Sequence, residues 1–95
     1  MHPYELMLVL NPNLEEEALD ARIGKVQELI SGRGGEIVKT EKWGKRKLAY
    51  EIAEFTEGFY VVMNFQGESA VATELERVLK ITDDVIRHLL VRTDE

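Results

Sequence analysis

The clearest chemical feature of the sequence is a cluster of positive charge in the segment WGKRKLAYEI, residues 43–52. Lys45, Arg46 and Lys47 are consecutive and Lys42 lies just before them, so four of the 12 Lys and Arg residues fall within six positions. The chain as a whole has a formal net charge of -6. Cationic side chains on a protruding strand neutralise nucleic-acid phosphates, and aromatic rings beside them stack on unpaired bases. The segment therefore indicates contact with the backbone of folded RNA.

A second interpretation of this segment needs no ligand, because Lys residues also keep an exposed strand edge from pairing with other chains. Trp43 and Tyr50 flank the cluster. Each is as consistent with a place in the core or at its rim as with stacking on an RNA base, since strands favour aromatic residues in general. Arg87 and Arg92, near the C-terminus, could extend the positive surface. The candidate RNA-binding residues are Lys42, Lys45, Arg46, Lys47, Arg87 and Arg92.

Other kinds of site lack the residues that they need. The chain has no Cys and only two His residues, His2 and His88, so a transition-metal site has few ligands to draw on. Ser31 and Ser69 have no base-orienting partners for nucleophilic catalysis. The glycines of Gly32–Gly35 follow a predicted helix, whereas a phosphate-binding loop links a strand to a helix. We therefore expect no catalytic residue, no metal, no cofactor and no small-molecule substrate.

Length and composition bound the class of protein. A chain of 95 residues with 44% hydrophobic content predicts one globular domain, residues 1–95. The lack of Cys weakly favours a reducing compartment. Apolar runs fall short of the roughly 18 residues that span a bilayer, and the first residues do not resemble a signal peptide. We expect a cytoplasmic protein that does not bind membranes.

Short apolar segments predict strands at 4–10, 59–65 and 85–91. The first two are apolar at both odd and even positions, which is typical of strands in the middle of a sheet. The last four residues, 92–95, are polar and should form a loose tail.

Two segments have apolar residues at helical spacing. The first should begin at a capping box formed by Asn13 and Glu16 and should stop at Gly32–Gly35, because glycine tolerates the left-handed conformation at a helix end. The second should be capped by Ser69. The apolar positions are Leu19, Ile23, Val26 and Ile30 in the first helix and Val71, Leu75, Val78 and Leu79 in the second.

The segment 36–53 has a strand-like pattern with Gly44 in its middle and allows two interpretations. Gly44–Lys47 could be a hairpin turn between two short strands. Alternatively, Gly44 is a bulge in one long strand whose hairpin turn is Glu54–Gly58. We favour the bulge, because the first turn lacks an Asn-Gly or Asp-Gly pair and isolated strand glycines often mark bulges.

The predicted order is strand, helix, strand, strand, helix, strand. It indicates an α+β fold, a ferredoxin-like β-α-β-β-α-β sandwich in which a four-stranded antiparallel sheet has both helices on one face. The other face then has no helical cover. Contiguous apolar side chains there indicate a docking surface for a partner. The candidate partner-binding residues are Met7, Val9, Tyr60 and Val62.

A sheet of this kind that binds RNA is often an RRM, which stacks bases on aromatic residues of its central strands. The segment EGFYVVMN has valine and asparagine where those rings belong, and LVLNPNL has no aromatic residue. We therefore expect RNA contact from strand ends, loops and neutralised phosphates.

Four segments, YELMLVLNPNL, WGKRKLAYEI, GFYVVMNF and DDVIRHLLVRT, resemble the bacterial small-subunit ribosomal protein six family, and the resemblance covers essentially the whole chain. One difference is Glu51, because the family usually has proline after the tyrosine that precedes it. The resemblance implies a ferredoxin-like fold, no catalysis and a structural role in the platform of the 30S subunit. It also implies a heterodimer with small-subunit ribosomal protein eighteen that binds the central domain of 16S rRNA beside other small-subunit components. An acidic chain attracts such a basic partner.

Two alternatives remain beside the ribosomal interpretation. A small regulatory module of the same fold would hold an effector between the first strand and the first helix, or would dimerise through the open sheet face. Such a module is commonly a homodimer, whereas a ribosomal subunit protein of this kind should be mostly monomeric alone. An acylphosphatase-like enzyme would need an Arg in the loop after the first strand, where Asn11, Pro12 and Asn13 stand.

Overall fold

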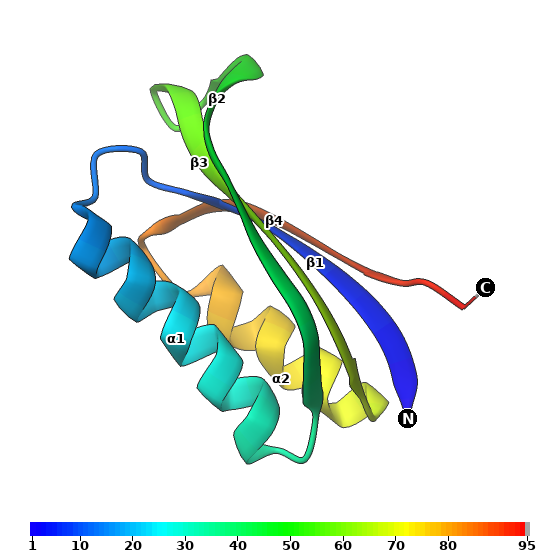
Figure 1. The fold of residues 1–95 in the computed structure, drawn as a ribbon. Coiled ribbons are helices and arrows are strands. Elements are labelled where there is room, and N and C mark those ends of the chain that lie inside the picture. Colours follow the sequence, from blue (N-terminus) through cyan, green and yellow to red (C-terminus); the bar gives the residue numbers. More distant parts are fainter. Residues whose placement is uncertain (95) are drawn as a thin grey trace.

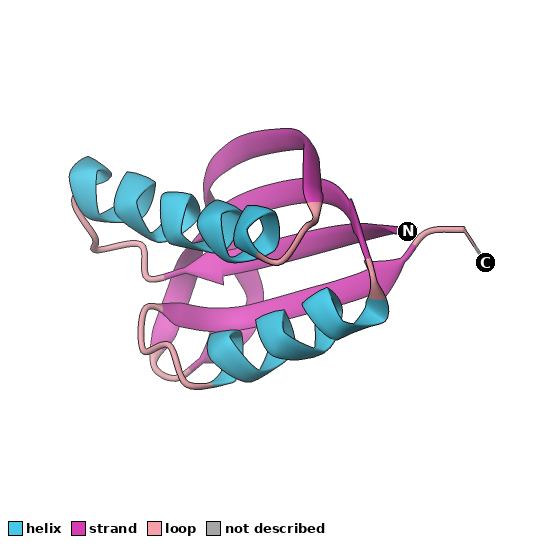
Figure 2. Ribbon diagram, turned by 90° about the horizontal axis from the view of Figure 1, so that it is seen from below, coloured by secondary structure: helices cyan, strands magenta, loops and turns pink. Residues whose placement is uncertain are grey.

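Residues 1–94 are described by a computed structural model, in which they form one four-stranded antiparallel sheet and two helices. The elements are β1 (His2–Leu10), α1 (Glu16–Gly32), β2 (Glu36–Ile52), β3 (Phe55–Gly67), α2 (Ser69–Lys80) and β4 (Val85–Arg92). The strand order is β2-β3-β1-β4. Both helices lie on the same face of the sheet (Figures 1 and 2). The predicted ferredoxin-like fold is confirmed, with β1 and β3 in the centre as expected.

The core lies between the two helices and the sheet. Every second residue of β1 from Tyr4 to Leu10 is buried in it, and the ring of Tyr4 stacks on Phe65 with centroids 5.3 Å apart. Burial of this apolar surface is the main stabilising force for a domain of this size. The helical contribution comes from all but one of the predicted positions, with Leu19, Ile23, Val26 and Ile30 from α1 and Val71, Leu75 and Leu79 from α2 in the core. Val78 is only half-buried and lies outside the core.

The predicted helix caps are wrong. α1 has Glu15 at its N-cap with no side-chain cap bond, and α2 begins at Ser69 itself, after Glu68. The amide of Asn13 donates to Oδ1 of Asn11 at 2.9 Å, so these residues form a side-chain-stabilised turn before the helix. Leu14 then packs against the core before α1 starts. The helix start is therefore set by this turn and by the packing of Leu14, and not by a capping box.

The interpretation of 36–53 as one bulged strand is confirmed. The pairing of β2 with β3 shifts register between Lys42 and Gly44, and Gly44 has φ +87°. Only glycine adopts this backbone conformation without strain. A bulge bends and twists its strand, so Gly44 marks a change in direction along β2.

The predicted turn at Glu54–Gly58 is wrong, because the chain reverses earlier. Ala53 and Glu54 both have positive φ, at 50° and 70°, and Ile52 pairs with Phe55. A two-residue turn with positive φ at both positions matches the twist of a hairpin. Ala and Glu are not residues that favour this turn, so the sequence did not reveal it.

The end of the chain is more ordered than expected. The amide of Thr93 donates to the carbonyl oxygen of Pro3 at 3.0 Å, and Arg92 pairs with Asp94. The loose tail predicted for 92–95 is therefore wrong for Arg92, which ends β4, and for Thr93, and Glu95 lies outside the described residues.

The close approach at Gly58 gives a test of the fold. A Cβ atom at this position would lie 2.3 Å from Cγ1 of Val9. We expect Gly58→Ala to lower the free energy of unfolding by about 1–3 kcal/mol, because the added methyl group overpacks the contact. Urea denaturation measures the change.

Gly24→Ala is the matched control, because Gly24 lies in α1 and a Cβ there would have nothing within 4 Å. This variant should be more stable than the native chain by about 0.5–1 kcal/mol, from the better helix propensity of Ala. Equal stability of Gly58→Ala and the native chain would contradict the contact with Val9.

Candidate functional site

The basic cluster lies on the end of the β2–β3 hairpin that projects beyond the helices (Figure 1). We call residues 43–58 the hairpin arm. The arm begins at the Gly44 bulge and reverses at Ala53 and Glu54. Because it projects from the body of the domain, side chains on it can reach a large ligand that does not touch the rest of the chain.

The register divides the cluster between the two sides of the arm. Lys45 is opposite Phe59 and Lys47 is opposite Glu57, so both lie on the sheet face that carries the helices, whereas Arg46 is opposite Gly58 on the other face. All three side chains are exposed. Within the described chain, Lys45 and Lys47 make no ion pair and no side-chain hydrogen bond. Their charges are therefore available to a ligand.

The two aromatic residues that flank the cluster are on the surface and outside the core. Trp43 lies at the bulge, and its side chain is 41% exposed. The guanidinium carbon of Arg46 lies 4.8 Å from the centre of its ring, which is a cation–π contact. Tyr50 is also exposed, nearer the tip of the arm.

The other three candidate cations have partners within the chain. Lys42 forms an ion pair with Asp20 of α1, and this hydrogen bond raises the pKa of the Lys42 ammonium. Arg92 donates to Asp94 at 2.6 Å and lowers the pKa of that carboxyl group. Nη1 of Arg87 lies 3.4 Å from the hydroxyl of Tyr50. These three cations would have to give up an internal partner to bind a ligand, whereas Lys45 and Lys47 would not.

The predicted apolar residues do meet on the face of the sheet without helices, which we call the open face. Met7 is opposite Val62 and Val9 is opposite Tyr60 in neighbouring strands. However, Val9 and Val62 are only 3% and 5% exposed. Both are outside the main core, so something other than the helices covers them.

The cover comes from the hairpin arm, which bends over the open face. The side chain of Leu48 is buried. Leu48 and Val9 both lie next to the point where a Cβ atom of residue 58 would be, so they approach Gly58 from the same side of the sheet. Farther along the arm, Tyr50 contacts Arg87 of β4, although β2 and β4 are opposite edges of the sheet. Lys45 and Lys47 therefore lie on the side of the arm that faces away from the open face.

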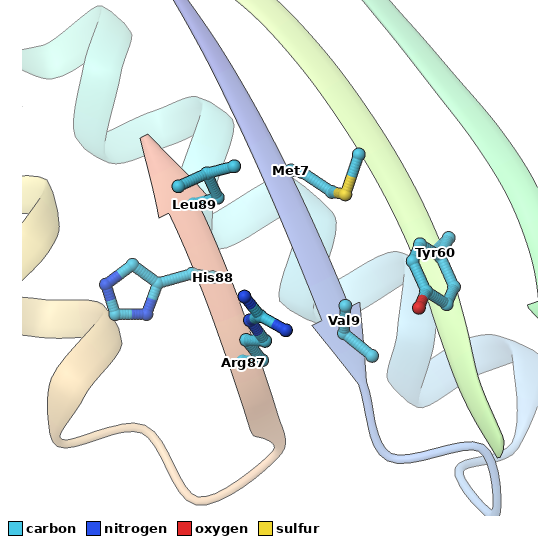
Figure 3. A pocket seen from close by; sticks show the side chains of 6 residues that line it. All are labelled: Met7, Val9, Tyr60, Arg87, His88 and Leu89. Atoms are coloured by element: carbon cyan, nitrogen blue, oxygen red, sulfur yellow. The ribbon is translucent and has the colours of Figure 1, made fainter. Parts of the chain in front are cut away.

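The accessible part of the open face is centred on a cavity of about 150 Å³ between β1, β3 and β4 (Figure 3). The ring of His88 points away toward α2, where Nε2 is 3.1 Å from a carboxylate oxygen of Glu76. Leu89 is 53% exposed beside the cavity. The residues that line the cavity are Met7, Val9, Tyr60, Arg87, His88 and Leu89.

Sequence reasoning missed Leu89 and Val91, which extend this apolar surface across β4. Leu89 is opposite Met7 and Val91 is opposite Glu5, so both lie on the open face. The run VIRHLLV is apolar on both sides, and only the register shows which side faces outward. The signal that could have found them is their spacing of two and four positions from Arg87, which puts all three side chains on one side of the strand.

Other kinds of site have little support in the part of the chain that the structure describes. Its His, Asp and Glu residues form no cluster of three or more that could hold a metal ion. Neither helix is long and apolar enough to cross a membrane.

Comparisons with known proteins agree with this architecture. The family model described as Ribosomal protein S6 matches residues 3–92. The chain is 57% identical to small ribosomal subunit protein bS6 of Heliobacterium modesticaldum, over 100% of this chain and 99% of that protein. It is 53% identical to small ribosomal subunit protein bS6 of Thermoanaerobacter pseudethanolicus, over 100% of both chains.

Two solved structures are also similar. The crystal structure of 30S ribosomal protein S6 from Thermotoga maritima has a TM-score of 0.91 and 37% sequence identity, and the match covers 96% of this chain and 86% of that one. The chemotaxis kinase CheA P2 domain, solved in complex with the response regulator CheY of Thermotoga maritima, has a TM-score of 0.59 over 97% of this chain and 98% of that one. Its sequence identity is 14%, so this second likeness concerns the fold alone.

The cover over the open face can be tested at Leu48. We expect Leu48→Ala to lower the free energy of unfolding by about 2 kcal/mol, because a buried leucine side chain at the domain edge is removed. Amide hydrogen exchange should also become faster in β1 around Val9. Tyr50→Phe, which removes only an exposed hydroxyl, should change stability by no more than about 0.5 kcal/mol. A Leu48→Ala variant with native stability would show that the arm does not cover Val9.

Proposed function

Because the chain belongs to the ribosomal protein S6 family, we propose that it binds the central domain of 16S rRNA, in the platform of the small subunit, together with small-subunit ribosomal protein eighteen. As a member of this family it is a non-enzymatic, structural protein of the small ribosomal subunit in the cytoplasm. In the proposal, the hairpin arm contacts RNA and the open face contacts the partner protein.

The observation that carries the RNA contact is the pair of free ammonium groups on the arm. Lys45 and Lys47 are exposed, project on one side of the hairpin and have no partner within residues 1–94. Phosphate contacts of this kind release counterions and dominate the affinity of nucleic-acid binding. Arg46 lies between them. Lys42, Arg87 and Arg92 are weaker candidates, because each would first exchange an internal partner.

The partner contact is supported by the open face. Leu89 and the cavity beside it expose apolar surface that the chain leaves uncovered. The charges on this face are mixed, because Glu5 and Glu41 share it with Arg87 and with Lys39, whose ammonium lies 3.4 Å from a carboxylate oxygen of Glu41. The electrostatic support for a basic partner is therefore the net charge of -6, which attracts it to the chain as a whole.

The size of the cavity on the open face favours protein docking there over the binding of a small ligand at the same place. Pockets that hold drug-sized ligands have volumes of about 300–1,000 Å³. The cavity on the open face has about 150 Å³, which is room for one side chain of a partner.

The RNA contact is tested by removing the two free lysines. We expect Lys45→Ala with Lys47→Ala to reduce the slope of log Kd against log salt by about 1.4, at ~0.7 for each lost phosphate contact. The measurement is filter binding of a 16S rRNA central-domain transcript with the partner protein present, between 50 and 200 mM salt.

Lys25→Ala with Lys80→Ala is the control for net charge, because both residues are exposed on helices away from the arm. It should leave the salt slope unchanged. If the two double variants gave the same slope as the native chain, the arm would not be the RNA contact.

The partner contact is tested at Leu89. We expect Leu89→Asp to weaken binding of ribosomal protein eighteen at least tenfold, because a carboxylate would be buried against apolar surface. Ile81→Asp is the matched control, since Ile81 is 69% exposed at the end of α2, beyond the open face. Isothermal titration calorimetry measures both affinities. Equal losses in the two variants would remove the open face as the docking surface.

A further inference from the structure

We propose that Trp43 and Arg46 form a stacking site for one unpaired nucleobase of the bound RNA. This inference rests on the proposed RNA binding and deepens it, because it adds a contact with a base to the contacts with phosphates.

The bulge puts the Trp43 side chain on the surface. The register of β2 against β3 shifts between Lys42 and Gly44, so Trp43 between them has no paired residue on β3. A bulge redirects the side chain of its extra residue. Trp43 stays outside the hydrophobic core and is 41% exposed. A large indole ring held at the surface in this way needs a role other than core packing.

Arg46 provides a second planar group at the same place. Its guanidinium carbon is 4.8 Å from the centre of the Trp43 ring, and in residues 1–94 it makes no ion pair. Gly58, opposite Arg46 on β3, has no side chain to compete for the guanidinium. Guanidinium and indole planes both stack on nucleobases. The pair is therefore assembled before RNA arrives.

The surrounding charge favours RNA over the partner protein as the ligand of this pair. Lys45 and Lys47 flank Arg46 in the sequence and are free, although the register places them on the other side of the arm. An RNA backbone that contacts these lysines along the edge of the arm would bring its bases within reach of the Trp43 ring. The open face offers little alternative, because β1 and β3 place only one aromatic residue, Tyr60, on it.

The test compares an aromatic and an aliphatic replacement of Trp43. We expect Trp43→Leu to weaken binding of the 16S rRNA central-domain transcript, with the partner present, about 5- to 100-fold at every salt concentration. The slope against salt should not change, because stacking releases no counterions. Trp43→Phe should retain most of the affinity. Arg46→Lys keeps the positive charge but removes the planar guanidinium group, and it should weaken RNA binding several-fold.

Fluorescence gives a second readout, because Trp43 is the only tryptophan of the chain. The difference between complexes of the native chain and of Trp43→Phe isolates its emission, which RNA should quench. Thermal unfolding of each variant verifies that the chain remains folded, and the contrast between Leu and Phe holds even if both are somewhat destabilised.

The outcomes separate this inference from the proposed function. If the Lys45 and Lys47 double variant loses its salt slope while Trp43→Leu binds RNA like the native chain, base stacking is wrong and phosphate contact stands. If neither variant weakens RNA binding, both proposals fail. If Trp43→Leu weakens binding of the partner without RNA, Trp43 belongs to the protein interface and the stacking site is overturned.

Discussion

The structure depends on a constraint of layer packing: two helices cover one face of a four-stranded sheet and cannot cover the other. Burial against α1 and α2 fixes one side of β1 and β3. The opposite side still has apolar residues, and water must be excluded from them by the chain itself or by a partner. Here the arm covers Val9, and Leu89 stays exposed. The open face is thus partly closed and partly available for docking.

The same bend that closes the open face also arranges the charges. Because the arm folds toward one side, Lys45 and Lys47 point to the other, away from Glu5 and Glu41. A chain with a net charge of -6 therefore still has a local cationic surface, which the proposed function assigns to RNA, on the other side of the arm from the open face that it assigns to the partner protein. Screening limits each field to about 8 Å at physiological salt, so the two surfaces act locally.

The elements themselves follow from sequence because their signals are local. Period-two and helical patterns identified every strand and both helices, and an isolated Gly44 identified the bulge. The errors lie at element ends. Asn13 does not cap the first helix, because its amide forms a turn with the side chain of Asn11. The hairpin turn was misplaced because Ala53 and Glu54 adopt positive φ, which is usual for Asn and Gly. At such positions tertiary packing outweighs local preference.

The sequence by itself determined the fold, the family, the location of the basic cluster and the β1 and β3 residues that meet on the uncovered face. Only the tertiary structure decided which of these groups are free. Lys42 is held by Asp20 and Arg87 contacts Tyr50, partners that are 22 and 37 positions away. Val9 is covered by the arm, and although Gly44 marks a bend in the sequence, only the contact with Leu48 shows what the bend covers. The physical reason is that charge and pattern are properties of residues, whereas exposure and pairing are properties of contacts between segments distant in the chain.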